Sequence, residues 1–141
     1  MIEPLFRIFV YGTLLEGERD HALLAGSERA GEACTEATYH LVDLDHYAAL
    51  VFGGTLSVYG QIYRVSAAVR RDIDVKRQVP ILFQRERIRI VDDVDVDAYV
   101  MSADQVRGRR RLHHGDWRKR FAPTPPRSPL GGYGRWPRNR P

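Results

Sequence analysis

The sequence predicts one small α+β domain, a mixed sheet or small barrel of roughly six short strands with one interposed helix. Its 141 residues suit a single domain. Short apolar and aromatic runs, several of them alternating with polar residues, are separated by Gly, Asp and Pro turn signals. One segment alone has a serine N-cap, helical spacing of apolar residues and a closing proline. Together these patterns favour strands flanked by short helices.

The first predicted strand runs from Leu5 to Tyr11, because this apolar and aromatic run is too short for a helix. Gly12 ends the strand, since glycine enters positive φ freely. A short helical or turn segment is expected from Glu16 to Gly26. Three further strands are predicted over residues 35–44, 47–52 and 55–65, with Gly53-Gly54 as a hairpin turn between the last two.

Ser66 is a good N-cap for the predicted helix, which extends from Ala67 to about Arg77. Pro80 closes this segment, because the residue before a proline avoids the α region. Two strands are then expected, over residues 84–91 and 94–100, with Asp92-Asp93 as the turn between them.

The charge of the chain is unevenly distributed. Residues 1–106 carry 11 Lys/Arg and 17 Asp/Glu, whereas residues 107–141 carry 11 Lys/Arg and a single Asp. Residues 1–106 are therefore mildly acidic, and the sequence predicts a domain over residues 1–120 followed by a basic tail over residues 121–141. A mildly acidic domain argues against nucleic-acid binding as its main role.

The predicted tail is rich in Pro, Gly and Arg, with few aliphatic residues, and is expected to be disordered. Two interpretations stay open for it: weak contact with RNA or another anionic surface, or a solvated tail without a ligand.

The sequence also gives indications about the cellular compartment of the protein and about metal binding. No apolar run approaches the roughly 20 residues that span a bilayer, so no membrane association is expected. The N-terminus lacks the pattern of a signal peptide, and Cys34 is the only cysteine, which together favour the cytoplasm. His113 and His114 lack further ligands at zinc spacing, which indicates surface residues rather than a metal site.

The turn after the first strand is the strongest functional signal in the residues themselves. Thr13, Leu14 and Leu15 follow Gly12 and offer successive peptide N–H groups, an arrangement that can hold a carboxylate or an oxyanion. The alternative is a strand that simply turns.

Four stretches, in this order, resemble the gamma-glutamylcyclotransferase-like family. They are Phe9-Val10-Tyr11-Gly12-Thr13-Leu14, Val58-Tyr59-Gly60-Gln61-Ile62-Tyr63, the passage Ile73-Asp74 to Pro80 with Phe83-Gln84-Arg85, and Leu112-His113-His114-Gly115-Asp116-Trp117-Arg118. The resemblance implies a small mixed β-barrel with a substrate pocket at its mouth. It also implies that Tyr11, Gly12, Thr13 and Leu14 bind the glutamyl part of the substrate, with Tyr63 as a further pocket residue or, equally, a core residue.

The resemblance implies an intramolecular acyl transfer that needs no metal or cofactor. The substrate's α-amine attacks its own γ-carbonyl, forms 5-oxoproline and expels an amine. Such a reaction requires near-attack geometry, donors for the oxyanion and one acid–base group. A carboxylate with a raised pKa suits that last role.

The sequence departs from the family pattern at this acid–base group. The family's general-base glutamate aligns with Arg77, and a guanidinium stays protonated and cannot act as a base. Asp74 is the weak candidate to replace it, and Asp72 and Glu86 are the other nearby carboxylates. Arg77 itself is expected either at the solvated end of the helix or in the pocket, holding a carboxylate. The sequence thus predicts a protein that releases 5-oxoproline from a γ-glutamyl amine or related small acidic amide or, alternatively, an inactive domain that binds small carboxylates.

Overall fold

The computed structural model describes residues 4–90 and 94–122 of the chain. Its strands are β1 Phe6–Val10, β2 Glu28–Cys34, β3 Tyr39–Asp43, β4 Ala48–Phe52, β5 Tyr59–Val65, β6 Gln84–Ile90, β7 Val94–Met101 and β8 Arg110–Arg111. The helix α1 is Ala67–Lys76, and four short 3₁₀ turns are η1 Gly12–Leu14, η2 His21–Leu24, η3 Asp104–Val106 and η4 Trp117–Lys119. The expected turn at Asp92-Asp93 and the tail from residue 123 lie outside the described residues.

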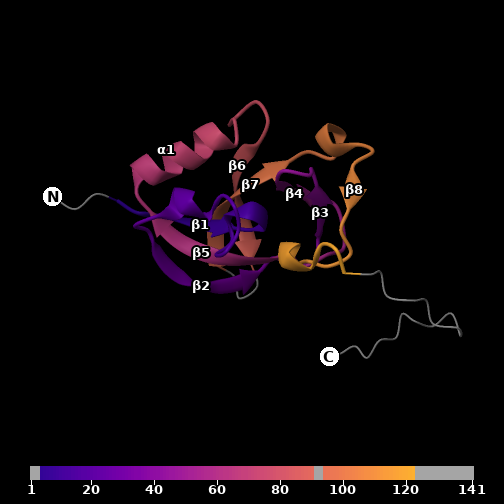
Figure 1. Ribbon diagram of the computed structural model, residues 1–141, viewed down its shortest axis with the longest axis horizontal. Coiled ribbons are helices and arrows are strands. Elements are labelled where there is room, and N and C mark those ends of the chain that lie inside the picture. The colour runs from indigo at the N-terminus through magenta and orange to yellow at the C-terminus, as the bar shows by residue number, and fades with distance from the viewer. Residues whose placement is uncertain (1–3, 91–93, 123–141) are drawn as a thin grey trace, which may run out of the picture.

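All eight strands belong to one mixed sheet (Figure 1). The order is β2-β5-β1-β7-β4-β3-β8, and β6 pairs with β7 as a branch. β7 is parallel to β1 and β4 and antiparallel to β6, whereas β1–β5, β2–β5 and β3–β4 are antiparallel. The sheet curls without closing, so the predicted α+β class is confirmed and the term barrel is approximate.

The central strands β1 and β4 of the sheet are buried on both faces. In β1, Phe9 belongs to one apolar cluster while Ile8 and Val10 belong to the other, as strand alternation requires. The second cluster includes Ile73 of α1, so the helix covers that face. Burial on both faces explains why the sequence of β1 is a continuous apolar run.

The predicted helix is confirmed at both ends. The Ser66 hydroxyl accepts a hydrogen bond from the Val69 amide at 3.2 Å, which caps the first turn. The helix ends at Lys76, and Arg77 is its C-cap. This end of the helix matters for function because it fixes the position of Arg77.

The predicted hairpin at Gly53-Gly54 is wrong. β4 pairs with β3, and the chain turns between them at residues 44–47, where Leu44 N donates to Tyr47 O at 2.9 Å. Gly53 and Gly54 instead donate their amides to the Thr38 carbonyl. A two-glycine signal marks a turn but does not determine which strands pair across it.

Strand β2 was not predicted from the sequence. Glu28–Cys34 contains few residues that favour strands, and it forms an edge of the sheet beside β5. Its backbone pairing and the Arg64–Glu28 ion pair at 3.0 Å hold it there. An edge strand of this kind leaves little hydrophobic pattern in the sequence.

The Gly115-Asp116-Trp117 segment lies at the end of the described residues and has a structural role. Asp116 accepts a hydrogen bond from the Arg118 amide and so caps η4, and Trp117 is buried. Gly115 lies so close to Ser57 that a Cβ would come within 2.0 Å of the Ser57 carbonyl oxygen. Among the described residues, no helix is long and apolar enough to span a membrane.

Candidate functional site

The loop after β1 begins with a glycine whose conformation and surroundings exclude other residues. Gly12 has φ +63°, and a Cβ there would lie 2.9 Å from the Ala48 Cβ. The loop therefore sits directly against the start of β4. Gly12, Thr13 and Leu14 are all buried.

The amides of this loop are largely used within it. Leu14 N donates to Tyr11 O at 3.3 Å and Leu15 N donates to Gly12 O at 3.1 Å. Of the three N–H groups expected to face a ligand, Thr13 N is the one that these two bonds do not use. The expectation of three successive open amides is corrected, because the 3₁₀ turn itself uses two of them.

Tyr11 anchors the start of the loop. Its hydroxyl donates to the Tyr99 carbonyl and accepts from Leu50 N at 2.9 Å. Burial, as the main cause, raises the pKa of this hydroxyl well above its usual value. The side chain of Tyr11 thus fixes the loop on β4 and β7.

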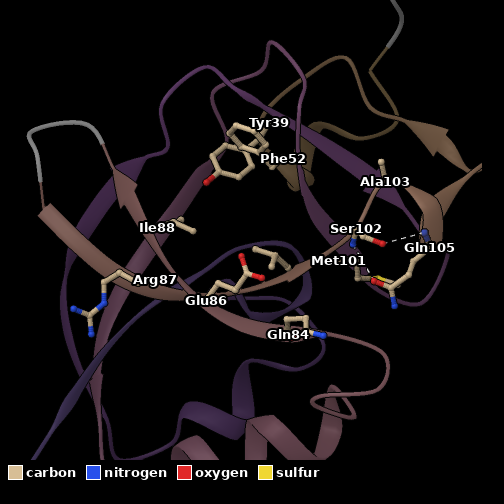
Figure 2. Close-up of a pocket in the computed structure, with 11 residues that line it drawn as sticks. Tyr39, Phe52, Gln84, Glu86, Arg87, Ile88, Met101, Ser102, Ala103 and Gln105 are labelled. Carbon is tan, nitrogen blue, oxygen red and sulfur yellow. Dashed lines mark hydrogen bonds between the residues drawn. The ribbon is translucent and has the colours of Figure 1, made fainter.

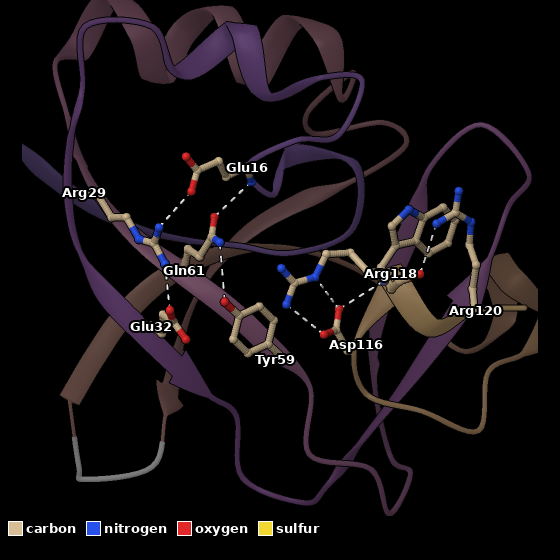
Figure 3. A network of polar contacts seen from close by, with 9 residues as sticks. Glu16, Arg29, Glu32, Tyr59, Gln61, Asp116, Arg118 and Arg120 are labelled. Atoms are coloured by element: carbon tan, nitrogen blue, oxygen red, sulfur yellow. Dashed lines mark hydrogen bonds and ion pairs between the residues drawn. The ribbon is translucent and has the colours of Figure 1, made fainter. Parts of the chain in front are cut away.

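Gln61 anchors the far end of the loop (Figure 3). Its buried side chain accepts a hydrogen bond from Glu16 N at 3.1 Å, and its amide nitrogen lies 3.4 Å from the Tyr59 hydroxyl. Glu16 also forms an ion pair with Arg29 at 2.9 Å. The loop is therefore held at its start by β4 and β7 through Tyr11, and at its end by β5 through Gln61.

Arg77 points into the protein toward this loop. It is only 4 % exposed, so the alternative of a solvated residue at the helix end is wrong. Its Nη2 donates to Thr13 Oγ1 at 2.9 Å, and its Nη1 forms an ion pair with Asp20 at 3.3 Å. The guanidinium carbon also lies 5.5 Å from the Tyr47 ring centroid and 5.8 Å from that of Phe83.

Asp20 is the functional candidate that the sequence reasoning missed. Its Oδ2 accepts a hydrogen bond from the Thr13 hydroxyl at 2.6 Å in addition to the contact with Arg77. Its amide donates to the Thr13 carbonyl at 2.9 Å. Thr13, Asp20 and Arg77 thus form a closed triangle of polar contacts, with the two charged side chains only 10 % and 5 % exposed. An aspartate after a loop is too common to be singled out from sequence.

A hollow of about 450 Å³ opens beside this triangle. We call it the basic hollow; it is lined by Arg19, Asp20, His46, Tyr47, Val75, Lys76, Arg77 and Gln78. Three of these side chains are cations and one is an anion. Tyr11, Gly12, Thr13 and Leu14 do not line it, and Thr13 reaches it only through Asp20 and Arg77. The arrangement suits a ligand with a carboxylate.

The other carboxylates considered from sequence are placed elsewhere. Asp74 forms an ion pair with Arg85 and accepts a hydrogen bond from the Tyr99 hydroxyl at 2.6 Å, which ties α1 to β6 and β7. Asp72 is exposed on α1. Glu86 lines a separate pocket. None of them lines the basic hollow.

Tyr63 lies in the apolar core beneath α1. Its ring packs against His21 in an edge-on arrangement with 5.6 Å between centroids, and His21 Nδ1 lies 2.9 Å from the Leu14 carbonyl oxygen. Tyr63 therefore supports the loop through His21 and does not line the basic hollow.

The curled mixed sheet, the anchored loop after β1 and the basic hollow define a small α+β domain with a charged hollow at the end of α1. Residues 8–119 match the family model described as "Gamma-glutamyl cyclotransferase, AIG2-like". The chain belongs to this gamma-glutamyl cyclotransferase family, which confirms the resemblance seen in its motifs.

Known proteins are similar to this chain in sequence or in fold. A Vibrio cholerae protein named "Putative gamma-glutamylcyclotransferase" is 38 % identical over 81 residues, covering 57 % of this chain and 70 % of the relative. The solution structure of ytfP from Escherichia coli is similar with a TM-score of 0.60 and 28 % identity, over 82 % of this chain and 99 % of that one. The crystal structure of a mouse AIG2-like protein has a TM-score of 0.63 and 24 % identity, over 70 % and 78 % of the two chains.

Proposed function

We propose that this protein binds the γ-glutamyl group of a small amide in the basic hollow and releases 5-oxoproline by intramolecular acyl transfer. The observation that carries the proposal is the position of Asp20, a carboxylate that contacts both Thr13 and Arg77 and lines the hollow. Asp20 supplies the acid–base group that position 77 lacks in this chain.

The charged side chains of the hollow each have a role in this reaction. Arg77, with Arg19 and Lys76 nearby, attracts and binds the α-carboxylate of the substrate. Asp20 takes one proton from the substrate's α-ammonium, and the freed amine attacks the γ-carbonyl carbon. Asp20 then returns the proton to the departing nitrogen as its bond to that carbon breaks. The attacking nitrogen loses a second proton as the lactam forms; Asp20, ionised again, accepts this proton and passes it to the released amine, so the products are 5-oxoproline and an ammonium ion.

The test measures 5-oxoproline released from a panel of γ-glutamyl amines by the purified chain. Asp20→Asn is expected to lower kcat by about 100-fold or more, the usual contribution of a general acid–base group. Asp104→Asn removes an exposed carboxylate on η3 and serves as the matched control, with unchanged turnover expected. Turnover that survives Asp20→Asn contradicts the role of Asp20, and no turnover on any substrate contradicts the reaction.

The contacts of Asp20 also favour a second function, the binding of a small carboxylate without reaction. Asp20 is ion-paired with Arg77 and accepts from Thr13, so its charge is already committed. In this alternative the hollow binds a small carboxylate without reaction. It predicts that 5-oxoproline or glutamate raises the melting temperature while no γ-glutamyl amine is converted.

One double variant separates the two functions. Asp20→Asn with Arg77→Glu places the carboxylate at the end of α1 and removes the one at Asp20. If the natural chain only binds, this variant should gain 5-oxoproline release. If the natural chain already reacts through Asp20, its activity should not depend on a carboxylate at position 77, and Arg77→Gln should raise KM more than it lowers kcat.

A further inference from the structure

A second cavity, of about 550 Å³, is lined mainly by residues of β6 and by the end of β7 with the segment that follows it (Figure 2). We call it the β6 pocket; it is lined by Tyr39, Phe52, Gln84, Glu86, Arg87, Ile88, Val100, Met101, Ser102, Ala103 and Gln105. It shares no residue with the basic hollow. Its volume lies in the range of small-molecule sites.

Glu86 supplies the unbalanced charge of this pocket. Its carboxylate points from β6 into the space below Tyr39 and Phe52, whereas Arg87 points away (Figure 2). Arg87 forms an ion pair with Asp97 at 3.3 Å. Glu86 forms no hydrogen bond or ion pair with the rest of the described residues. Of the two charged residues that line the pocket, Arg87 is paired with Asp97, whereas Glu86 has no ionic partner among the described residues.

The side-chain amides of Gln84 and Gln105 already donate hydrogen bonds within the protein. Gln105 Nε2 donates to the Leu82 carbonyl at 2.8 Å, and its Oε1 accepts from Ser102 N at 2.9 Å. Gln84 Nε2 donates to the Pro80 carbonyl at 3.2 Å. These bonds do not involve Glu86, whose carboxylate is the charged group of the lining that has no partner among the described residues.

Aromatic and apolar side chains line the pocket beside this carboxylate, and Glu86 itself is exposed. The rings of Tyr39 and Phe52 meet edge to face at 81°, with 5.8 Å between centroids. Ile88 and Met101 are buried and form apolar lining, while Phe52 is 71 % exposed at the rim. Burial first, and then the charges of Glu36 and Glu86, raise the pKa of the Tyr39 hydroxyl, which indicates that the negative field of Glu86 reaches this ring.

We propose that the β6 pocket binds a small aliphatic amine as its ammonium cation. The ammonium group pairs with Glu86 and lies against the Tyr39 and Phe52 rings, and the alkyl chain contacts Ile88 and Met101. Carboxylate pairing and cation–π attraction both require the charged form of the amine. This site is independent of the reaction proposed for the basic hollow.

The experiment titrates the full chain with 1,5-diaminopentane and, separately, with 1,5-pentanediol, which has the same chain without charge. Calorimetry gives the Kd, and amide NMR shifts locate the bound amine. We expect saturable binding of the diamine with shifts in β6, and much weaker binding of the diol. Glu86→Gln should raise the Kd at least about tenfold, as loss of one charge-assisted hydrogen bond implies. Glu28→Gln, an exposed carboxylate on β2, should leave it unchanged.

Phe52→Ala provides a second variant that should not disturb folding, because Phe52 is mostly exposed. It should raise the Kd about two- to fivefold, the contribution of an exposed cation–π contact. Equal affinity for the diol, an unchanged Kd in a folded Glu86→Gln variant, or shifts centred on Asp20 and Arg77 would each overturn the proposal. A failure of 5-oxoproline release has no bearing on this result.

Discussion

Arg77 and Asp20 form a buried ion pair whose two charges stabilise each other. Removing one partner from such a pair leaves an uncompensated charge, at a cost of about 3–5 kcal/mol, whereas replacing both costs far less. We therefore expect Arg77→Met to lower the free energy of unfolding by about 3 kcal/mol. The double variant Arg77→Met with Asp20→Leu should recover much of that loss. Urea denaturation of the natural chain, both single variants and the double variant measures the coupling. Additive losses would show that the two side chains are not energetically paired.

The sequence located one member of this pair and missed the other. Position 77 could be singled out because it aligns with a family motif, and because a cation there contradicts the expected chemistry. Asp20 has no motif of its own, and it reaches Thr13 only because η1 and η2 fold the chain back over seven residues. Contacts of that kind depend on tertiary structure and leave no periodic signal.

Asp116 gives a pH-dependent prediction at a single residue. A hydrogen bond from the Arg118 side chain, as the main cause, lowers the pKa of the Asp116 carboxyl below its ordinary value of 3.8. A lowered pKa in the folded state means that the carboxylate stabilises the fold above pH 3.8, and that this contribution is lost as the pH falls through the lower folded-state pKa. Asp116→Asn should therefore be less stable than the natural chain at pH 7. The difference in stability between the two chains should shrink below pH 4, which thermal melts over a pH series can measure. A difference that stays constant with pH would contradict the link between this pKa and stability.

At the scale of the elements, α1 depends on the cap that begins it. Ser66→Ala removes the acceptor of the Val69 amide, and we expect a loss of about 1 kcal/mol in the free energy of unfolding. Because α1 carries Arg77 at its other end, the variant also tests whether fraying of the helix start reaches the basic hollow. Ser66→Asp retains an acceptor and should preserve stability. Chemical denaturation of both variants checks the prediction. If Ser66→Asp lost as much free energy of unfolding as Ser66→Ala, the prediction would be contradicted.

The elements that could be predicted from the sequence carry their own local signals. α1 has a cap and a closing proline, and β6 and β7 have alternating apolar residues, so all three were expected near their observed limits. β2 lacks such a signal, since an edge strand is defined by its backbone pairing with β5. The pairing of β4 with β3 instead of β5 likewise depends on sheet topology, which turn residues alone do not determine.

Close packing between elements yields a further prediction. Gly60 of β5 lies against β1, and a Cβ there would come within 2.4 Å of both the Phe9 ring and the Val10 carbonyl oxygen. Gly60→Ala should destabilise the fold by about 1–3 kcal/mol, the usual cost of overpacking a core. Gly26→Ala is a useful contrast, because its Cβ would meet nothing within 4 Å and only its positive φ opposes the change. Equal melting temperatures for Gly60→Ala and the natural chain would contradict the close approach of β1 and β5.

At the scale of the whole molecule, charge is segregated between the family domain and the C-terminal residues. The family match ends at residue 119, and residues 121–141, which we propose to be a separate tail, contain four arginines and no acidic residue. Deleting them lowers the formal net charge from +4 to zero. Contacts between cations and a polyanion release counterions, so their strength falls steeply with salt.

We therefore expect the full chain to be retained on immobilised heparin at low salt and the 1–120 chain to elute at a clearly lower salt concentration. A variant with the four tail arginines replaced by glutamine is the matched control, because it retains the length of the tail and should elute with the shorter chain. If all three chains elute together, the cations at residues 107–120 account for the retention. If the shorter chain alone elutes early, the tail acts through something other than its charge. In either case the 5-oxoproline assay should not distinguish the three chains, because every residue of the basic hollow lies before residue 79.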